Sequence, residues 1–193
     1  MKLEWHFSKC YLRLKPIRKD LHRKLALKGK QSHEILVNHV LSLGSDIRVE
    51  TMRVQGLQKR TKKTTRNKKK RYGKVIVNRA TAMLMEIIDR KLHYQGRKMK
   101  KINTFKVKAS QFNHVTGEYN KKDLNERWNE NILGGRIQRD LYSAFLIGNT
   151  VDTLDAVDVD LCNRGWKSFV ALHHHEVARL GQHRNKQMRW YVA

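Results

Sequence analysis

The chain has 193 residues and is strongly basic, with 42 Lys and Arg against 17 Asp and Glu and a formal net charge of +25. This length allows one domain with an inserted segment, and a hydrophobic content of 39% is enough for a modest core, which argues against a fully disordered chain. The charge is too large for an enzyme that acts on neutral substrates in free solution, and it favours a polyanion, with nucleic acid as the first candidate.

Basic helices and a strand are predicted for the first part of the chain. The spacing of apolar residues predicts a helix over residues 16–28, ended by Gly29, and a second helix over residues 32–43, ended by Gly44. Alternating β-branched and polar residues then predict a strand over residues 46–52. No apolar run of about 18 residues occurs and no signal peptide opens the chain. We therefore expect a cytoplasmic, nucleoid-associated protein with no membrane partner.

The charge is concentrated in one loop. Residues 1–101 hold 29 basic and 7 acidic residues, whereas residues 102–193 hold 13 and 10. The densest stretch is 59–74, which has ten Lys or Arg and no acid. Such a loop either contacts phosphates or is a solvated tail, and the first interpretation is favoured because ten like charges serve little structural purpose. The predicted nucleic-acid-binding residues are Lys59, Arg60, Lys62, Lys63, Arg66, Lys68, Lys69, Lys70 and Arg71.

The rest of the chain alternates helix and strand. Apolar periodicity predicts a helix over residues 80–92, a strand over 101–107, a helix that begins near 137 and a last helix over 166–180. Residues 109–136 show no sustained period and are expected to form an insertion. This order is typical of an α/β fold, in which strands separated by helices tend to pair in parallel.

Two acidic residues are candidates for a metal site. Glu50 lies at the end of the first predicted strand, where sites assemble in open α/β sheets, and Asp140 lies in the first turn of the helix near residue 137. Carboxylate oxygens suit Mg²⁺ or Mn²⁺, and two such ions can activate water for phosphodiester cleavage. Alternatively, Asp140 merely complements a helix dipole and Glu50 pairs with a nearby cation.

Three segments occur in a distinctive order: IRVETMRVQGLQKR (47–60), NRATAMLMEIIDRKLHYQGRKMKKINTFKVKASQ (78–111) and RIQRDLYSAFLI (136–147). They contain, in turn, a strand with Glu and a Gly-Leu turn, a helix and strand with a Ser-Gln pair, and an Arg-Asp pair that opens a helix. In this order they resemble the C-terminal portion of TnpB-like, transposon-encoded RNA-guided nucleases, the insertion-sequence transposase family related to type V CRISPR effectors. The resemblance covers about residues 12–180.

This resemblance implies a partial RNase H-like, RuvC-type α/β fold. Glu50 and Asp140 match the second and third catalytic carboxylates, which would bind magnesium or manganese, and the implied partners are DNA and a guide RNA. The implied organisation is a basic helical segment (1–30), a RuvC-like core part with a basic loop at 58–74 (31–108), a degenerate ribbon-like insertion (109–136) and C-terminal helices that complete the RuvC-like part (137–193).

The chain departs from the family pattern at the first carboxylate. The family has an Asp on an apolar strand followed by Gly, whereas Glu4, Asp20, Glu34 and Asp46 all lack that setting. A site with two of three carboxylates is expected to hold Mg²⁺ poorly, so the chain is expected to be inactive alone. A separate chain that supplies the N-terminal half is a candidate partner.

The second departure is in the zinc ribbon. The CxxC pairs of the family are absent, and His114 alone cannot close a tetrahedral zinc site, so no zinc is expected. Phe112, Tyr119 and Trp128 are expected to pack this segment instead. His173, which shares an apolar helix face with Phe169, is predicted to be a packed histidine rather than a metal ligand.

Three functions from different classes remain. The first is a TnpB-like nuclease piece with a partial metal site, and the second is a nuclease-dead DNA- or RNA-binding derivative. The third is a small basic RNA-binding protein of ribosomal type, which ranks last because it has no need of the Glu50 and Asp140 segments in that order.

Overall fold

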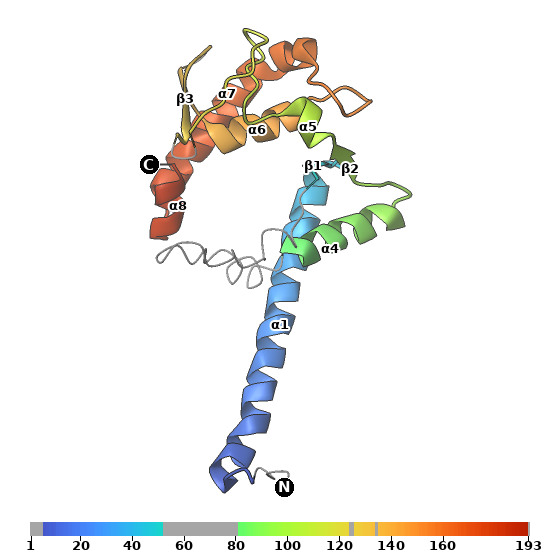
Figure 1. Cartoon of the computed structure of the whole chain (residues 1–193), viewed down its shortest axis with the longest axis vertical. Coiled ribbons are helices and arrows are strands. Elements are labelled where there is room, and N and C mark those ends of the chain that lie inside the picture. Colours follow the sequence, from blue (N-terminus) through green and yellow to red (C-terminus); the bar gives the residue numbers. More distant parts are fainter. Residues whose placement is uncertain (1–5, 52–80, 124–125, 134, 193) are drawn as a thin grey trace, which may run out of the picture. The chain divides into compact units, whose positions relative to one another are not determined.

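The structure is a computed structural model that describes residues 6–51, 81–123, 126–133 and 135–192 (Figure 1). Its chain divides into two compact units. Unit 1 consists of Met1–Ser45 with Arg53–Lys98, and unit 2 consists of Asp46–Met52 with Met99–Ala193.

The first element of unit 1 is one long helix, α1 (Lys9–Leu43), where two helices were predicted. Ser8 caps it, because its side chain accepts a hydrogen bond from the backbone N–H of Tyr11 at 3.2 Å. The prediction that Gly29 ends a helix is wrong. A glycine inside a helix costs only about 1 kcal/mol relative to Ala, and the residues on both sides of Gly29 continue the helix.

The second described helix of unit 1, α4 (Thr81–Tyr94), confirms the prediction for residues 80–92. It packs against the carboxyl-terminal part of α1, where Val37 is fully buried. Glu34 on α1 forms ion pairs with Arg90 at 2.5 Å and with Lys91 at 2.7 Å on α4. Apolar burial and a charged cluster therefore hold this part of α1 to α4.

Unit 2 begins with a short parallel strand pair, β1 (Arg48–Glu50) and β2 (Lys100–Ile102). The parallel pairing agrees with the α/β order read from the sequence, although both strands are shorter than predicted. The prediction of a strand through residue 107 is wrong, because Asn103 starts a helical turn, α5 (Thr104–Val107), by accepting bonds from the backbone N–H groups of Phe105 and Lys106.

A hairpin follows in the segment where no regular structure was predicted. β3 (Trp128–Ile132) pairs antiparallel with β4 (Gly135–Gln138), and an isolated bridge joins Phe112 to Tyr119 upstream of it. The pairing of β3 with β4 shifts register between Asn129 and Ile132, so the hairpin is irregular. The sequence gives a weak signal here because the strands are short and lack a clear alternation of apolar and polar residues.

Three helices complete unit 2: α6 (Arg139–Gly148), α7 (Val159–Gly181) and α8 (Lys186–Tyr191). The two predicted helices are present, but α7 begins seven residues before the predicted start. Asp158 caps it, because its carboxylate accepts a hydrogen bond from the backbone N–H of Leu161 at 2.9 Å.

The core of unit 2 combines residues from the segment after β2, the hairpin, α6 and α7. Trp166 and Phe169 on α7 pack against Phe145 on α6, with the Phe145 and Phe169 rings stacked at 4.4 Å between centroids. The buried cluster comprises Ile102, Val107, Ala109, Phe112, Ile132, Ile137, Tyr142, Leu146 and Cys162. At the coarse level the structure is mixed α/β, with mostly helical elements and two small sheets among the described residues.

Candidate functional site

Glu50 is the last residue of β1 and is partly buried. Beyond it, the chain is held to the end of β2, since the Thr51 hydroxyl donates to the carbonyl of Ile102 at 3.1 Å. On the other side of Glu50, the Arg48 guanidinium donates to the backbone carbonyl of Thr150 and to its hydroxyl at 3.1 Å. Glu50 therefore lies at the carboxyl end of a strand that is anchored at both sides, as predicted from its position in the sequence.

Asp140 lies in the first turn of α6, and its side chain is 53% exposed. Gln138 caps the helix, because its side-chain oxygen accepts a hydrogen bond from the backbone N–H of Leu141 at 2.8 Å. Tyr191 on α8 is close to this carboxylate. The pKa of Tyr191 is raised, first by burial and then by the Asp140 charge. A carboxylate at the positive end of the helix dipole is stabilised there, so the alternative structural role for Asp140 also fits.

The anchoring contacts of the two candidate carboxylates lie at different ends of α6. Arg48, two residues before Glu50, bonds to Thr150 just beyond the carboxyl end of this helix, whereas Asp140 is in its first turn. A helix of this size is about 15 Å long. Two metal ions in a nuclease site are about 4 Å apart. These contacts do not bring Glu50 and Asp140 together. A single metal site that contains both carboxylates stays a prediction.

In the described part of the chain, no group of three or more His, Cys, Asp or Glu side chains is arranged to hold a metal ion. Glu50 and Asp140 are hard oxygen ligands of the kind that Mg²⁺ and Mn²⁺ take, but two carboxylates alone leave most of the coordination to water. The donor set therefore fits these ions only in part.

His114 is packed inside unit 2 and is 2% exposed. Its backbone N–H donates to the Tyr142 hydroxyl at 3.1 Å, and its Nδ1 lies 2.7 Å from the same oxygen. The Trp166 ring lies 4.7 Å from the imidazole, between centroids. Burial lowers the pKa of His114 and raises that of Tyr142 to about 12. Aromatic packing and hydrogen bonds thus hold the segment around His114 in place.

The aromatic residues expected to pack the insertion do so in different ways. Phe112 and Tyr119 contact each other at 4.9 Å between ring centroids, as predicted. Trp128 has other neighbours: the Arg136 guanidinium lies 4.4 Å from its ring centroid, and the His173 ring stands perpendicular to it at 6.3 Å between centroids. Trp128 therefore links the hairpin to α7 rather than to Phe112 and Tyr119.

His173 is buried, which confirms the prediction of a packed histidine. Its Nε2 accepts a hydrogen bond from the backbone N–H of Gln138 at 3.0 Å, and burial lowers its pKa. The bond joins α7 to the start of α6, next to Asp140. The sequence pattern placed His173 on an apolar helix face, but it did not identify Gln138 as its partner, since the two are 35 residues apart.

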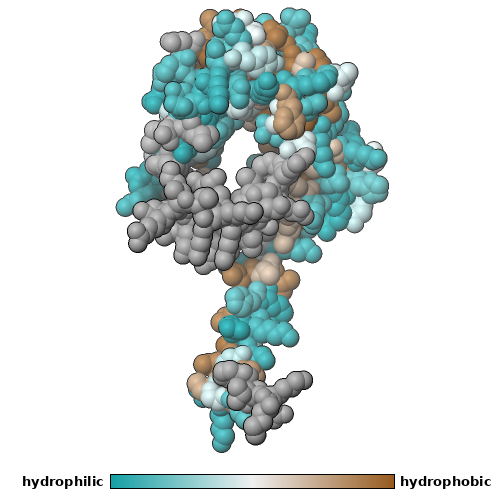
Figure 2. All heavy atoms as spheres, in the orientation of Figure 1, coloured by the Kyte–Doolittle hydropathy of each residue, from teal (hydrophilic) through white to brown (hydrophobic). Residues whose placement is uncertain are grey.

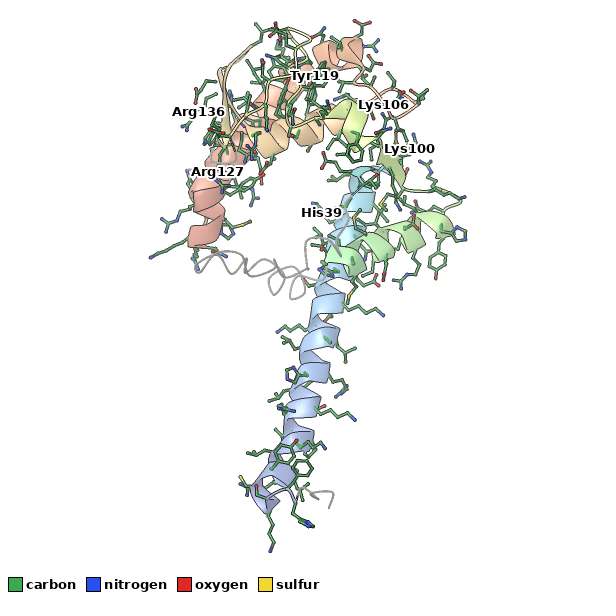
Figure 3. The ribbon with its side chains drawn as sticks, in the orientation of Figure 1. His39, Lys100, Lys106, Tyr119, Arg127 and Arg136 are labelled. Atoms are coloured by element: carbon green, nitrogen blue, oxygen red, sulfur yellow. The ribbon has the colours of Figure 1, made fainter. Side chains whose placement is uncertain are left out.

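Cations gather beside the hairpin. A cavity of about 490 Å³ is lined by Lys122, Glu126, Arg127, Trp128, Glu130 and Arg136. The labelled Arg127 and Arg136 lie on the same side of unit 2 (Figure 3). Burial lowers the pKa of Lys122, whose ammonium donates to the side-chain oxygen of Asn129. The cations of this surface are partly offset by carboxylates, as shown by the ion pair of Arg136 with Glu130 at 3.1 Å.

The predicted nucleic-acid-binding loop lies outside the described residues. This applies to Lys59, Arg60, Lys62, Lys63, Arg66, Lys68, Lys69, Lys70 and Arg71. In the described part of unit 1, a second basic surface is visible. Residues 9–30 of α1 hold nine Lys or Arg and one Asp, and the nine cations are all exposed. Helix α1 therefore carries part of the excess positive charge of residues 1–101.

Comparisons with known proteins add no relative. No model of a protein family, no curated protein and no solved structure matches the chain. Among the described residues, no helix is both long enough and apolar enough to cross a membrane.

Proposed function

We propose that this chain is a transposase-related nucleic-acid-binding protein that resembles the C-terminal part of a TnpB-like RNA-guided DNA endonuclease. The observation that carries the proposal is the parallel pairing of β1 and β2 across the segment that contains α4, with Glu50 at the carboxyl end of β1. This arrangement supports a partial RNase H-like, RuvC-type core. In this proposal, the hairpin between β2 and α6 corresponds to the ribbon-like insertion.

Nucleic acid is the proposed partner because nearly all of the excess positive charge lies in residues 1–101, and a concentrated positive charge attracts a polyanion. The net charge of residues 1–101 is +22, and that of the remaining residues is +3. Each Lys or Arg that neutralises a phosphate releases a counterion, which makes binding strongly dependent on salt. In this proposal, α1 and the loop at 59–74 bind DNA and a guide RNA, and unit 2 carries the two carboxylates.

Glu50 and Asp140 are the proposed metal-binding carboxylates. A bound Mg²⁺ or Mn²⁺ would supply Lewis-acid stabilisation of the cleaved phosphodiester. The fit is partial, because the described residues offer no third carboxylate in a common group. We therefore expect the chain to bind nucleic acid without cutting it unaided, which makes the nuclease-dead derivative the second form of the same proposal.

A cleavage assay separates the two forms. Plasmid and single-stranded DNA are incubated with the chain and Mg²⁺ or Mn²⁺, alongside Glu50→Ala, Asp140→Ala and the matched control Glu130→Ala on the hairpin. No cutting at any metal concentration is the expected result. Cutting that disappears in Glu50→Ala and Asp140→Ala, but survives in Glu130→Ala, would establish an active nuclease.

A binding experiment tests the nucleic-acid partner itself. The affinity for a DNA duplex and for RNA is measured between 50 and 300 mM salt by fluorescence anisotropy. Neutralising Lys68, Lys69, Lys70 and Arg71 to Gln is expected to reduce the slope of log K against log salt by about 3 to 4. The control neutralises Lys167 and Lys186 on α7 and α8, and an equal reduction in that variant would contradict the assignment to the loop.

A further inference from the structure

The amino-terminal half of α1 carries an exposed apolar stripe. It consists of Leu14, Ile17, Leu21 and Leu25, whose exposed fractions lie between 49% and 70%. At 100° per residue, these four positions fall on one side of the helix. Figure 2 shows apolar residues exposed along α1 between hydrophilic ones. Branched apolar side chains that recur at helical spacing are typical of a surface that another element covers.

The stripe continues into the half of α1 that contacts α4, but α4 lies on another face. Ile35, on the same side as Ile17, is 63% exposed, and Leu43 is 78% exposed. The residues of α1 that meet α4 are Glu34, Val37 and Asn38. Helical geometry places Val37 roughly opposite Leu21 around the axis. Helix α4 therefore leaves the apolar stripe uncovered over the described length of α1.

Charge around the stripe decides which partner can cover it. Arg13, Lys24 and Lys28 border it on one side and Arg18 on the other. Asp20 is the only acid within residues 9–30, and its carboxylate binds Arg23 at 2.7 Å and Lys24 at 2.9 Å. Within the described residues, no acidic partner is recorded for the other cations of this half. A second copy of α1 would bring like charges together and is disfavoured.

Nucleic acid could pair its phosphates with the cations of α1, but it could not cover the apolar stripe. Phosphates offer no apolar surface, so DNA bound along this side would leave Leu21 and Leu25 in water. Lys15, Lys19 and Lys30 project from roughly the opposite side of the helix and can contact phosphates there. Leu12 and Leu27, each 54% exposed, also lie on that side, but they are far apart along the helix and form no continuous stripe. The two sides of α1 therefore suit different partners.

We propose that the stripe of α1 docks an acidic amphipathic helix of a partner protein, while the opposite side of α1 stays free for nucleic acid. Leu and Ile side chains of the partner would cover Leu14, Ile17, Leu21 and Leu25, and its Glu or Asp side chains would pair with Arg13, Arg18 and Lys28. This is the arrangement by which charged flanks select the partner of an apolar helix seam. This docking proposal does not depend on the proposed resemblance to RNA-guided nucleases.

The test uses the full chain and a labelled, designed helical peptide of about 20 residues that has Leu on one face and Glu on both flanks. The acidic peptide is expected to bind with a Kd on the order of micromolar and with a stoichiometry of one to one. The triple variant Ile17→Ala, Leu21→Ala and Leu25→Ala is expected to bind at least about tenfold more weakly. Its helix content, measured by circular dichroism, stays at the wild-type value because Ala favours helix.

The matched control changes Lys15, Lys19 and Lys30 to Gln. It should keep peptide affinity within about threefold and weaken binding of single-stranded DNA, whereas the stripe variant should do the reverse. Three results would overturn the proposal: equal binding of a peptide with Gln in place of Leu, self-association of the free chain through the stripe in sedimentation velocity, or loss of DNA binding in the stripe variant. Absence of peptide binding by the wild-type chain would also overturn it.

Discussion

The two units use their apolar residues in opposite ways. In the described part of unit 1, burial is confined to the contact of α4 with the carboxyl-terminal part of α1, and most of the large apolar side chains of α1 are exposed. In unit 2, helices α6 and α7 and the hairpin enclose a contiguous core with several aromatic rings. Because most helical stability in proteins comes from the packing of an apolar face, unit 2 can hold its own structure, whereas the exposed length of α1 would gain stability from a partner.

The largest expected effect comes from the core of unit 2. Leu146 on α6 is fully buried, so Leu146→Ala leaves a cavity and should lower the free energy of unfolding by about 2–5 kcal/mol. Leu21→Ala on α1 is the matched change at a side chain that is 60% exposed, and it should alter the free energy by less than about 0.5 kcal/mol. Urea denaturation followed by tryptophan fluorescence measures the change in unit 2, where Trp128 and Trp166 lie, and far-ultraviolet circular dichroism measures the change in α1. Equal losses would show that the two units do not differ as described.

A smaller loss of stability is expected when the hydroxyl oxygen of Tyr142 is removed. The Tyr142 hydroxyl accepts the buried backbone N–H of His114, so Tyr142→Phe leaves that donor without its acceptor. The expected loss of stability is about 1–3 kcal/mol, the usual cost of an unsatisfied buried polar group. Tyr94→Phe is the control, because Tyr94 is largely exposed at the end of α4. A neutral Tyr142→Phe would mean that another group satisfies the His114 backbone.

The two buried histidines predict a pH dependence confined to unit 2. Burial lowers the pKa of His114 and His173 below the ordinary value of 6.5, so the unfolded chain binds protons first as the pH falls. Stability is therefore complete above pH 6.5 and declines below it, by at most about 1.4 kcal/mol per pH unit for each histidine. Thermal unfolding between pH 7.5 and 5 measures this loss. A midpoint that stays constant over that range would contradict the burial of both rings in the neutral state.

The smallest effect is expected in unit 1. Hydrogen bonding from Lys91, and then from Arg90, keeps the pKa of Glu34 below its ordinary value of 4.5, so this cluster stays charged through the pH range in which the histidines titrate. Glu34→Gln should increase amide hydrogen exchange in α4 slightly and leave exchange in α7 unchanged, because charged pairs near water contribute little. Glu176→Gln, at the exposed Arg179 pair on α7, is the control. A large effect of Glu34→Gln on both units would show that they unfold together.

Several elements were predictable because their causes are local. The apolar period of residues 80–92 gave α4, and the order of strands and helices gave the parallel pairing of β1 and β2. The burial of His173 followed from its place on an apolar helix face. The continuity of α1 through Gly29 was not predicted, since the penalty of one glycine is small against the helix-forming residues around it. The turn at Asn103 was also missed, because a side-chain cap competed with a weak strand pattern.

By itself, the sequence determined the charge of the chain, the position of Glu50 at the end of a strand and of Asp140 at the start of a helix, and the lack of CxxC pairs. Only the tertiary structure decided how the insertion is held. Tyr142, Trp166 and Gln138 meet His114 and His173 across 28 to 52 residues of chain, and no local pattern encodes such contacts. The tertiary structure also decided which apolar residues α4 covers and which stay in water. Helical spacing places a residue on a face, but the packing of other elements determines whether that face is buried.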